Sequence, residues 1–94
     1  FKVKIIHLNP HSKISLHRHK YRAEHWIVIL GTAKVTCGGK NFSLSENEST
    51  FIPSAEKHRL ENNTDTALRL IEIQTGERLE EADIERFEDE YGRD

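Results

Sequence analysis

The stretch HRHKYRAEHW, residues 17–26, concentrates three histidines, one glutamate and three cationic side chains. If residues 15–19 are extended, His17 and His19 lie on one face of a strand, because side chains two apart point the same way. The following strand alternates too, and its shared inner face comprises Glu24, Trp26, Val28 and Leu30. Two imidazoles and a carboxylate therefore meet in the interior, where they suit a borderline divalent metal ion.

The composition predicts one soluble domain. The chain has 94 residues, a charged share of 32% and a net charge of -2, with no long basic run, so a nucleic-acid partner is not expected. A single cysteine, Cys37, excludes an internal disulfide and favours a reducing, cytoplasmic location. No apolar run reaches the roughly 18 to 20 residues that cross a membrane, and no signal peptide is visible.

Short β-like runs separated by turn residues fill the chain to about residue 76. They are residues 3–8, 13–17, 25–30, 32–37, 41–44, 49–52, 58–62 and 67–75, a series typical of a β-sandwich or small barrel. From Leu79 the pattern changes, because Ile84, Phe87 and Tyr91 recur at steps of three and four. This spacing predicts one amphipathic helix over about 79–91 that packs against the barrel.

The spacing of the candidate ligands resembles the two motifs of the cupin superfamily. His17, His19, Glu24 and Gly31 match the first motif, G-x5-H-x-H-x3,4-E-x6-G, except at its first glycine. The second motif, G-x5-P-x-G-x2-H-x3-N, is matched by Pro53, His58 and Asn62. The three motif glycines that are missing are replaced by His11, Asn47 and Ala55, so we expect these turns to be built differently. The resemblance implies an all-β cupin fold, a double-stranded β-helix or jelly-roll barrel, spanning residues 1–94 as a single domain.

A narrower resemblance covers nearly the whole chain. The runs SLHRHKYRAEHWIVILGTAKVT, LSENESTFIP, KHRLEN and LIEIQTG, with the tail DIERFEDEYGR, look like the type II phosphomannose isomerase domain. That domain usually forms the C-terminal part of bifunctional mannose-1-phosphate guanylyltransferase/mannose-6-phosphate isomerase proteins. The chain starts at Phe1 without methionine, so we expect it to be a piece of a longer protein whose nucleotidyltransferase half lies elsewhere. His17 departs from the pattern, since many members carry glutamine there.

The resemblance implies a site for one divalent ion, Zn, Fe, Mn, Co or Ni, held by His17, His19, Glu24 and His58. In an aldose-ketose isomerase the ion would bind the adjacent oxygens of mannose 6-phosphate while a base moves a proton between C2 and C1, yielding fructose 6-phosphate. Glu72 is the candidate base, because a carboxylate among the apolar side chains of RLIEIQ is costly to bury without a purpose. The alternative for Glu72 is a rim glutamate paired with an arginine.

Arg22 is the candidate anchor for the substrate phosphate, because a guanidinium grips phosphate through two parallel hydrogen bonds. The alternative is that Arg22 pairs with an acidic side chain and orders its loop. Other cations near the motifs are fallback candidates for the same role, namely Lys20, Lys57 and Arg59.

The expected partners are the sugar phosphate and a second copy of the chain. Ile27 and Ile29 point away from the ligand face and need cover, which a second sheet, the helix or a homodimer would supply. Two other functions stay open at this stage. One is a non-catalytic sugar-binding or dimerisation module of a sugar nucleotidyltransferase, and the other is a different cupin enzyme such as a metal-dependent dioxygenase.

Overall fold

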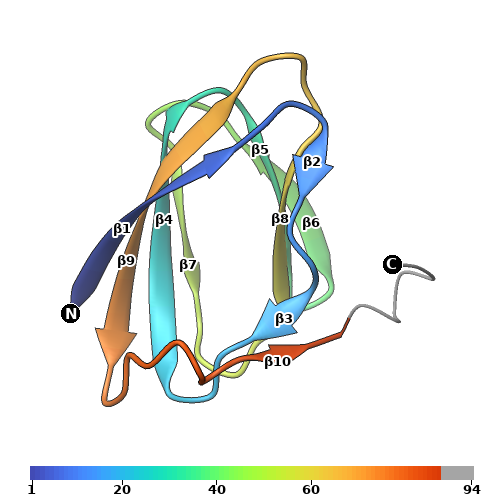
Figure 1. Ribbon diagram of the computed structural model, residues 1–94. Coiled ribbons are helices and arrows are strands. Elements are labelled where there is room, and N and C mark those ends of the chain that lie inside the picture. The colour runs from blue at the N-terminus through green and yellow to red at the C-terminus, as the bar shows by residue number, and fades with distance from the viewer. Residues whose placement is uncertain (88–94) are drawn as a thin grey trace.

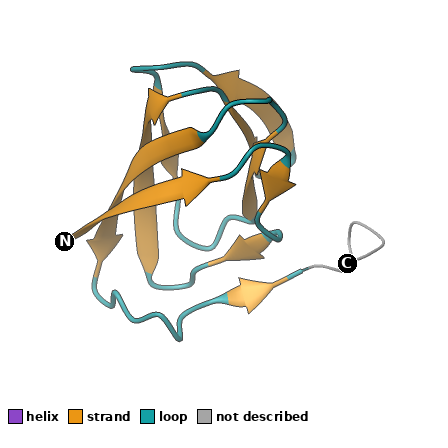
Figure 2. Cartoon of the chain, turned by 45° about the horizontal axis from the view of Figure 1, so that its top comes forward, coloured by secondary structure: helices purple, strands orange, loops and turns teal. Residues whose placement is uncertain are grey.

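The computed structural model describes residues 1–87, which form two antiparallel sheets that face each other (Figure 1). The first sheet has the order β1 (Lys2–Leu8), β9 (Leu68–Gly76), β4 (Arg22–Leu30) and β7 (Ser49–Ile52). The second has the order β10 (Glu85–Arg86), β3 (His17–Arg18), β8 (His58–Asn62), β5 (Ala33–Cys37) and β6 (Lys40–Leu44), and β2 (Ser12–Lys13) also pairs with β8. The described part is all-β, as predicted, and contains no helix of a length and hydropathy that would cross a membrane (Figure 2).

The core lies between the two sheets and follows the alternation of the strands. Its buried apolar side chains are Leu8, Trp26, Val28, Ala33, Val35, Leu44, Ile52, Leu60, Leu68 and Leu70. Trp26 is therefore a core residue, as the sequence favoured, with 2% of its surface exposed. The prediction for Leu30 is wrong, since it is 44% exposed. The pairing of β4 with β9 shifts register between Val28 and Leu30, and such an irregularity breaks the alternation of faces.

The turns that lack motif glycines keep a glycine-like backbone. His11, Asn47 and Ala55 have φ angles of 56°, 72° and 69°, and they are the only non-glycine residues with positive φ in the described chain. The expectation that these turns are built differently is therefore wrong. The left-handed conformation is retained by residues with a Cβ, at a cost of roughly 1 kcal/mol or more where the side chain offers no local compensation.

Asn62, the last residue of the second motif, ties three segments of one end of the barrel together. Its Nδ2 donates to the carbonyl oxygens of Leu8, Asn9 and Thr66, at 2.8 to 3.2 Å. Its Oδ1 accepts from the backbone N–H and the hydroxyl of Thr64. Asn62 is fully buried, so these bonds satisfy polar groups that water cannot reach.

The predicted helix over 79–91 is wrong within the described residues. Residues 77–87, which we call the C-terminal strap, contain turns and the short strand β10, while residues 88–91 lie outside the described part. β10 pairs with β3, and the N–H of Phe87 donates to the carbonyl oxygen of Leu16. These bonds to another strand replace the internal bonds of a helix. Ile84 and Phe87 thus recur at helical spacing in a segment that runs across the open end of the barrel (Figure 1).

Candidate metal centre

Three of the four predicted ligands meet inside the barrel. His17 in β3 lies directly opposite His58 in β8, and His19 follows β3 by one residue. One ligand nitrogen from each of the three imidazoles lies within 4.8 Å of the others. All three side chains are buried, with 9%, 5% and 1% exposed for His17, His19 and His58. The strand pairing therefore brings together residues that are 41 positions apart in the chain.

Each of these imidazoles is held by a backbone carbonyl on its Nδ1 side. The Nδ1 atoms of His17 and His58 lie 2.9 and 3.0 Å from the carbonyl oxygens of Ser15 and Glu56, and Nδ1 of His19 bonds the carbonyl of Asp83. A carbonyl oxygen can only accept, so Nδ1 carries the proton and Nε2 keeps its lone pair. Carbonyl-held imidazoles of this tautomer are the usual arrangement of histidine ligands to a metal, and here Nε2 of His19 accepts a hydrogen bond from Arg22.

The electrostatics of the cluster favour neutral imidazole. Burial, followed by the nearby His17, lowers the pKa of His58 from 6.5 to about 4. Burial also lowers the pKa of His17. Nε2 of His58 is buried without a hydrogen-bond partner in the described structure, which is costly unless a ligand uses it. Three imidazoles that converge in this way fit a divalent transition-metal ion.

Glu24, the fourth predicted ligand, lies beside this cluster but is engaged elsewhere. Its Oε2 accepts from Arg22 at 2.9 to 3.0 Å and lies 3.4 Å from Nε2 of His19. Its Oε1 accepts from the indole N–H of Trp26 at 2.8 Å. Burial opposes the charge of Glu24, but His58, Trp26 and Arg22 together lower the pKa of this carboxyl. Its role as a metal ligand stays a prediction.

The two predicted catalytic residues, Arg22 and Glu72, are also buried in the barrel. Nη2 of Arg22 donates to Nε2 of His19 at 3.0 Å and lies 4.0 Å from Oε2 of Glu72. Arg22 pairs with Glu24, which is the contact expected from its structural alternative, and its Nη1 has no partner among the described residues. Burial, then the charge of Glu24, raises the pKa of Glu72, and Gln74 donates to it at 2.6 Å.

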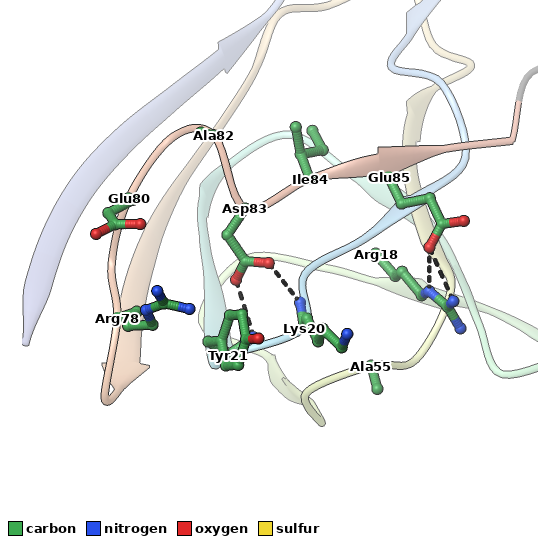
Figure 3. A pocket seen from close by; sticks show the side chains of 10 residues that line it. All are labelled: Arg18, Lys20, Tyr21, Ala55, Arg78, Glu80, Ala82, Asp83, Ile84 and Glu85. Carbon is green, nitrogen blue, oxygen red and sulfur yellow. Dashed lines mark hydrogen bonds and ion pairs between the residues drawn. The ribbon is translucent and has the colours of Figure 1, made fainter.

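A cavity of ≈170 Å³ joins these groups and is covered by the strap. Its polar lining includes His17, His19, Arg22, Glu24 and Glu72, and Ile84 of the strap lies on it. A larger pocket of ≈520 Å³ lies on the other side of Ile84, outside the histidine cluster (Figure 3). The larger pocket therefore does not contain the clustered histidines, and the inner cavity is the better candidate for the active site.

The fallback phosphate anchors are placed away from the histidines. Lys20 lines the outer pocket. Lys57 lies 4.3 Å from the ring centre of Phe87. Arg59 is on the face of β8 opposite His58 and pairs with Glu61 at 3.3 Å.

Sequence reasoning missed two strap-side residues that the fold brings to this end of the barrel. Arg78 lies over the ring of Tyr21 at 4.5 Å and lines the outer pocket. Asp83 accepts hydrogen bonds from the imidazole of His19 and from the backbone N–H groups of Lys20 and Tyr21. Nothing in the sequence signalled these contacts, because the acidic tail that contains Asp83 matched the solvent-exposed face of a helix.

Comparison with known proteins agrees with this geometry. Residues 1–89 match the family model described as mannose-6-phosphate isomerase C-terminal. The chain belongs to this family. It is 55% identical over 93 residues to the alginate biosynthesis protein AlgA of Pseudomonas aeruginosa and 53% identical to the xanthan biosynthesis protein XanB of Xanthomonas campestris. It is 48% identical to a mannose-1-phosphate guanylyltransferase of Escherichia coli. These matches cover 99% of the chain but only 19 to 20% of each relative, so the chain spans about a fifth of the length of those proteins.

Solved structures confirm the cupin fold of this family member. A double-stranded β-helix protein of Klebsiella pneumoniae matches with a TM-score of 0.77 at 20% identity, covering 89% of this chain and 71% of that one. A predicted oxalate decarboxylase of Thermotoga maritima matches with a TM-score of 0.75 at 25% identity, covering 80% and 65%. The double-stranded barrel predicted from the two motifs is therefore present.

Proposed function

We propose that this domain is a metal-dependent isomerase that interconverts mannose 6-phosphate and fructose 6-phosphate. The observation that carries the proposal is the convergence of three carbonyl-held imidazoles beside a small cavity, which two of them line together with a carboxyl group of raised pKa. The family match supports the substrate class. His17, His19 and His58 would hold one divalent ion, with Glu24 as the candidate fourth ligand. When bound, the ion supplies Lewis-acid stabilisation of charge on the substrate oxygens.

Glu72 is the residue best suited to move the proton between C2 and C1. A carboxyl with a raised pKa exchanges protons nearer to neutral pH, as general acid-base catalysis requires. Gln74 holds one oxygen of Glu72 through a hydrogen bond, and this bond fixes the orientation of the carboxyl group. The inner cavity is lined by Glu72, His17 and His19, so a substrate there contacts the base and two of the ligands together.

Arg22 would contact the substrate phosphate through the group that the barrel leaves unpaired. Its Nε and Nη2 bind Glu24, whereas Nη1 is buried and lacks a partner in the described structure. A buried N–H without an acceptor is costly, and a phosphate oxygen would satisfy it. This assignment keeps the pairing with Glu24 as the contact that orients the guanidinium.

A non-catalytic sugar-binding or dimerisation module is the second candidate. The observation in its favour is that the relative from E. coli carries only a guanylyltransferase name, although it is 48% identical to this chain. In that role the barrel keeps its fold and its histidine cluster without turning over substrate. The two candidates differ in whether the metal-loaded chain isomerises mannose 6-phosphate.

A coupled isomerase assay separates them. We expect activity with the metal-replete chain, loss of activity after chelation, and recovery when the metal is returned. His58→Gln should be inactive, whereas His11→Gln is the matched control, because His11 is exposed in a turn and is not a predicted ligand. A metal-loaded, folded chain without any isomerase activity would favour the non-catalytic module.

We also propose that a second copy of the chain covers the outer face of the four-stranded sheet. One row of side chains across that face is Val3, Ile73, His25 and Phe51, and the next is Ile5, Ile71, Ile27 and Ser49. Val3, Ile5 and Phe51 are 50 to 59% exposed. Neither row contains aspartate, glutamate, lysine or arginine. A two-fold contact between two copies would therefore bury apolar surface without burying an unpaired charge.

A further inference from the structure

The C-terminal strap is attached to the barrel mainly by polar contacts. Lys2 donates to the carbonyl of Leu79 at 3.0 Å, Lys4 lies 3.4 Å from Glu81, and Arg18 pairs with Glu85 at 2.8 Å. These ion pairs are exposed, and exposed ion pairs contribute little to stability. These side-chain ion pairs therefore hold the strap weakly. Arg86 lies opposite His17 in the pairing of β10 with β3, and Asp83 bonds the imidazole of His19.

Asp83 makes three hydrogen bonds to consecutive residues of the barrel. Its two carboxylate oxygens accept the backbone N–H groups of Lys20 and Tyr21, each at 2.9 Å (Figure 3). Its own carbonyl oxygen accepts Nδ1–H of His19. The side chain of Asp83 thus fixes the loop that follows His19, while its backbone fixes the ring of His19 itself.

This arrangement makes the strap part of the support of the histidine cluster. His17 and His58 each bond a carbonyl two residues away in the same local segment, so the short spacing of the chain orients these rings. His19 instead depends on a carbonyl 64 positions later in the chain. Its ring is therefore held from two sides, by Nη2 of Arg22 at Nε2 and by the carbonyl of Asp83 at Nδ1, and the second contact exists only when the strap is docked.

We propose that Asp83 is a positioning residue for the metal centre, and that docking of the strap is thermodynamically coupled to metal binding through His19. The proposal rests on the metal-binding part of the proposed function and not on the isomerase chemistry. Removing a partner that orients a ligand typically lowers metal affinity by about 10- to 100-fold. Because coupling is reciprocal, a bound ion should hold the strap in place by the same factor.

Titration calorimetry with Zn²⁺ tests the proposal on the chain and two variants. We expect Asp83→Ala to weaken Zn²⁺ binding by about 10-fold or more, since the backbone carbonyl is no longer held against His19. Asp83→Asn should lose less affinity, because its amide oxygen can still accept one of the two N–H groups. Glu85→Gln is the matched control, since it removes an acidic strap residue that binds only the exposed Arg18 side chain, and its affinity should stay within about twofold of the unmodified chain.

A second measurement reports the coupling without any enzyme assay. In the unmodified chain, Zn²⁺ should slow hydrogen exchange at the amides of Lys20 and Tyr21, and in Asp83→Ala this protection should disappear. Thermal unfolding of the metal-free proteins checks that the variants remain folded; if Asp83→Ala does not fold, Asp83→Asn carries the comparison alone.

Three results would overturn the proposal. Equal Zn²⁺ affinity in Asp83→Ala and the unmodified chain would show that Asp83 does not position His19. An equal loss of Zn²⁺ affinity in Glu85→Gln would show that any weakening of the strap lowers the affinity, without a specific role for Asp83. Failure of the isomerase proposal is distinguishable, because Zn²⁺ binding and its dependence on Asp83 are measured without substrate. An unmodified chain that binds no Zn²⁺ would overturn both this proposal and the proposal of a metal-dependent isomerase.

Discussion

The most direct consequence of burying three imidazoles is that the metal-free protein should lose stability as the solution is acidified from pH 7 to pH 5. The pKa of His58 is about 4 in the folded chain, below its ordinary value of 6.5, because of burial and the neighbouring His17. The unfolded chain therefore binds the proton more readily than the folded chain. The stability that neutral His58 contributes is fully present above pH 6.5 and is lost as the pH falls toward 4.

The size of the effect follows from the two pKa values. Between pH 7 and pH 5 a shift from 6.5 to about 4 corresponds to a loss of about 2 kcal/mol in the free energy of unfolding. His17 adds a loss of the same sign, because its pKa is lowered too. Glu72 acts in the opposite direction, since its raised pKa makes protonation favour the folded state. A comparison with a variant is therefore needed to isolate His58.

Urea denaturation of the chelated protein at pH 7 and pH 5 measures the loss, with His58→Gln as the test variant and His11→Gln as its control. We expect the loss between the two pH values to be smaller by about 2 kcal/mol in His58→Gln than in the unmodified chain. In His11→Gln it should change little, because that ring is exposed and its ion pair with Asp65 lies at the surface. The reasoning would be refuted if the unmodified chain and His58→Gln lost the same free energy.

Four other predictions concern the barrel turns and the buried Asn62, the candidate phosphate anchor and the outer face of the four-stranded sheet. Asn62→Asp replaces three N–H donor contacts with a carboxylate facing carbonyl oxygens, and should lower the free energy of unfolding by about 3 kcal/mol in chemical denaturation. Ala55→Gly should raise it by up to about 1 kcal/mol because φ is positive there, with a smaller gain for Asn47→Gly, since asparagine tolerates this conformation; equal effects would contradict the strain argument. Arg22→Lys should raise KM for mannose 6-phosphate with metal content and folding unchanged, whereas loss of metal or of thermal stability would support a structural role alone. Phe51→Glu should convert the proposed dimer to monomer in sedimentation experiments, and a monomeric unmodified chain would contradict the interface.

The sequence by itself was sufficient for the barrel and for most of its inner face. Alternation predicts that His17 and His19 share a face and that Glu24 and Trp26 point inward, and both strands satisfy it. This works because the strand period of two is a local property of the backbone. The spacing of the two motifs also predicted that His58 joins them, although the strand pairing that brings His58 opposite His17 is a long-range contact.

Only the tertiary structure decided which hydrogen-bond partners the C-terminal strap and the buried polar side chains take. Helical spacing of Ile84 and Phe87 was overridden because the strap gains hydrogen bonds to β3 and places Ile84 on the cavity. Periodicity reports which side chains share a face, but it does not report whether a backbone bonds itself or a neighbouring strand. The partners of polar side chains were also only partly visible in the sequence. Arg22 pairs with Glu24, which lies two residues away on the same face of β4, so this contact is local. The link from Asp83 to His19 follows from packing of segments distant in the chain.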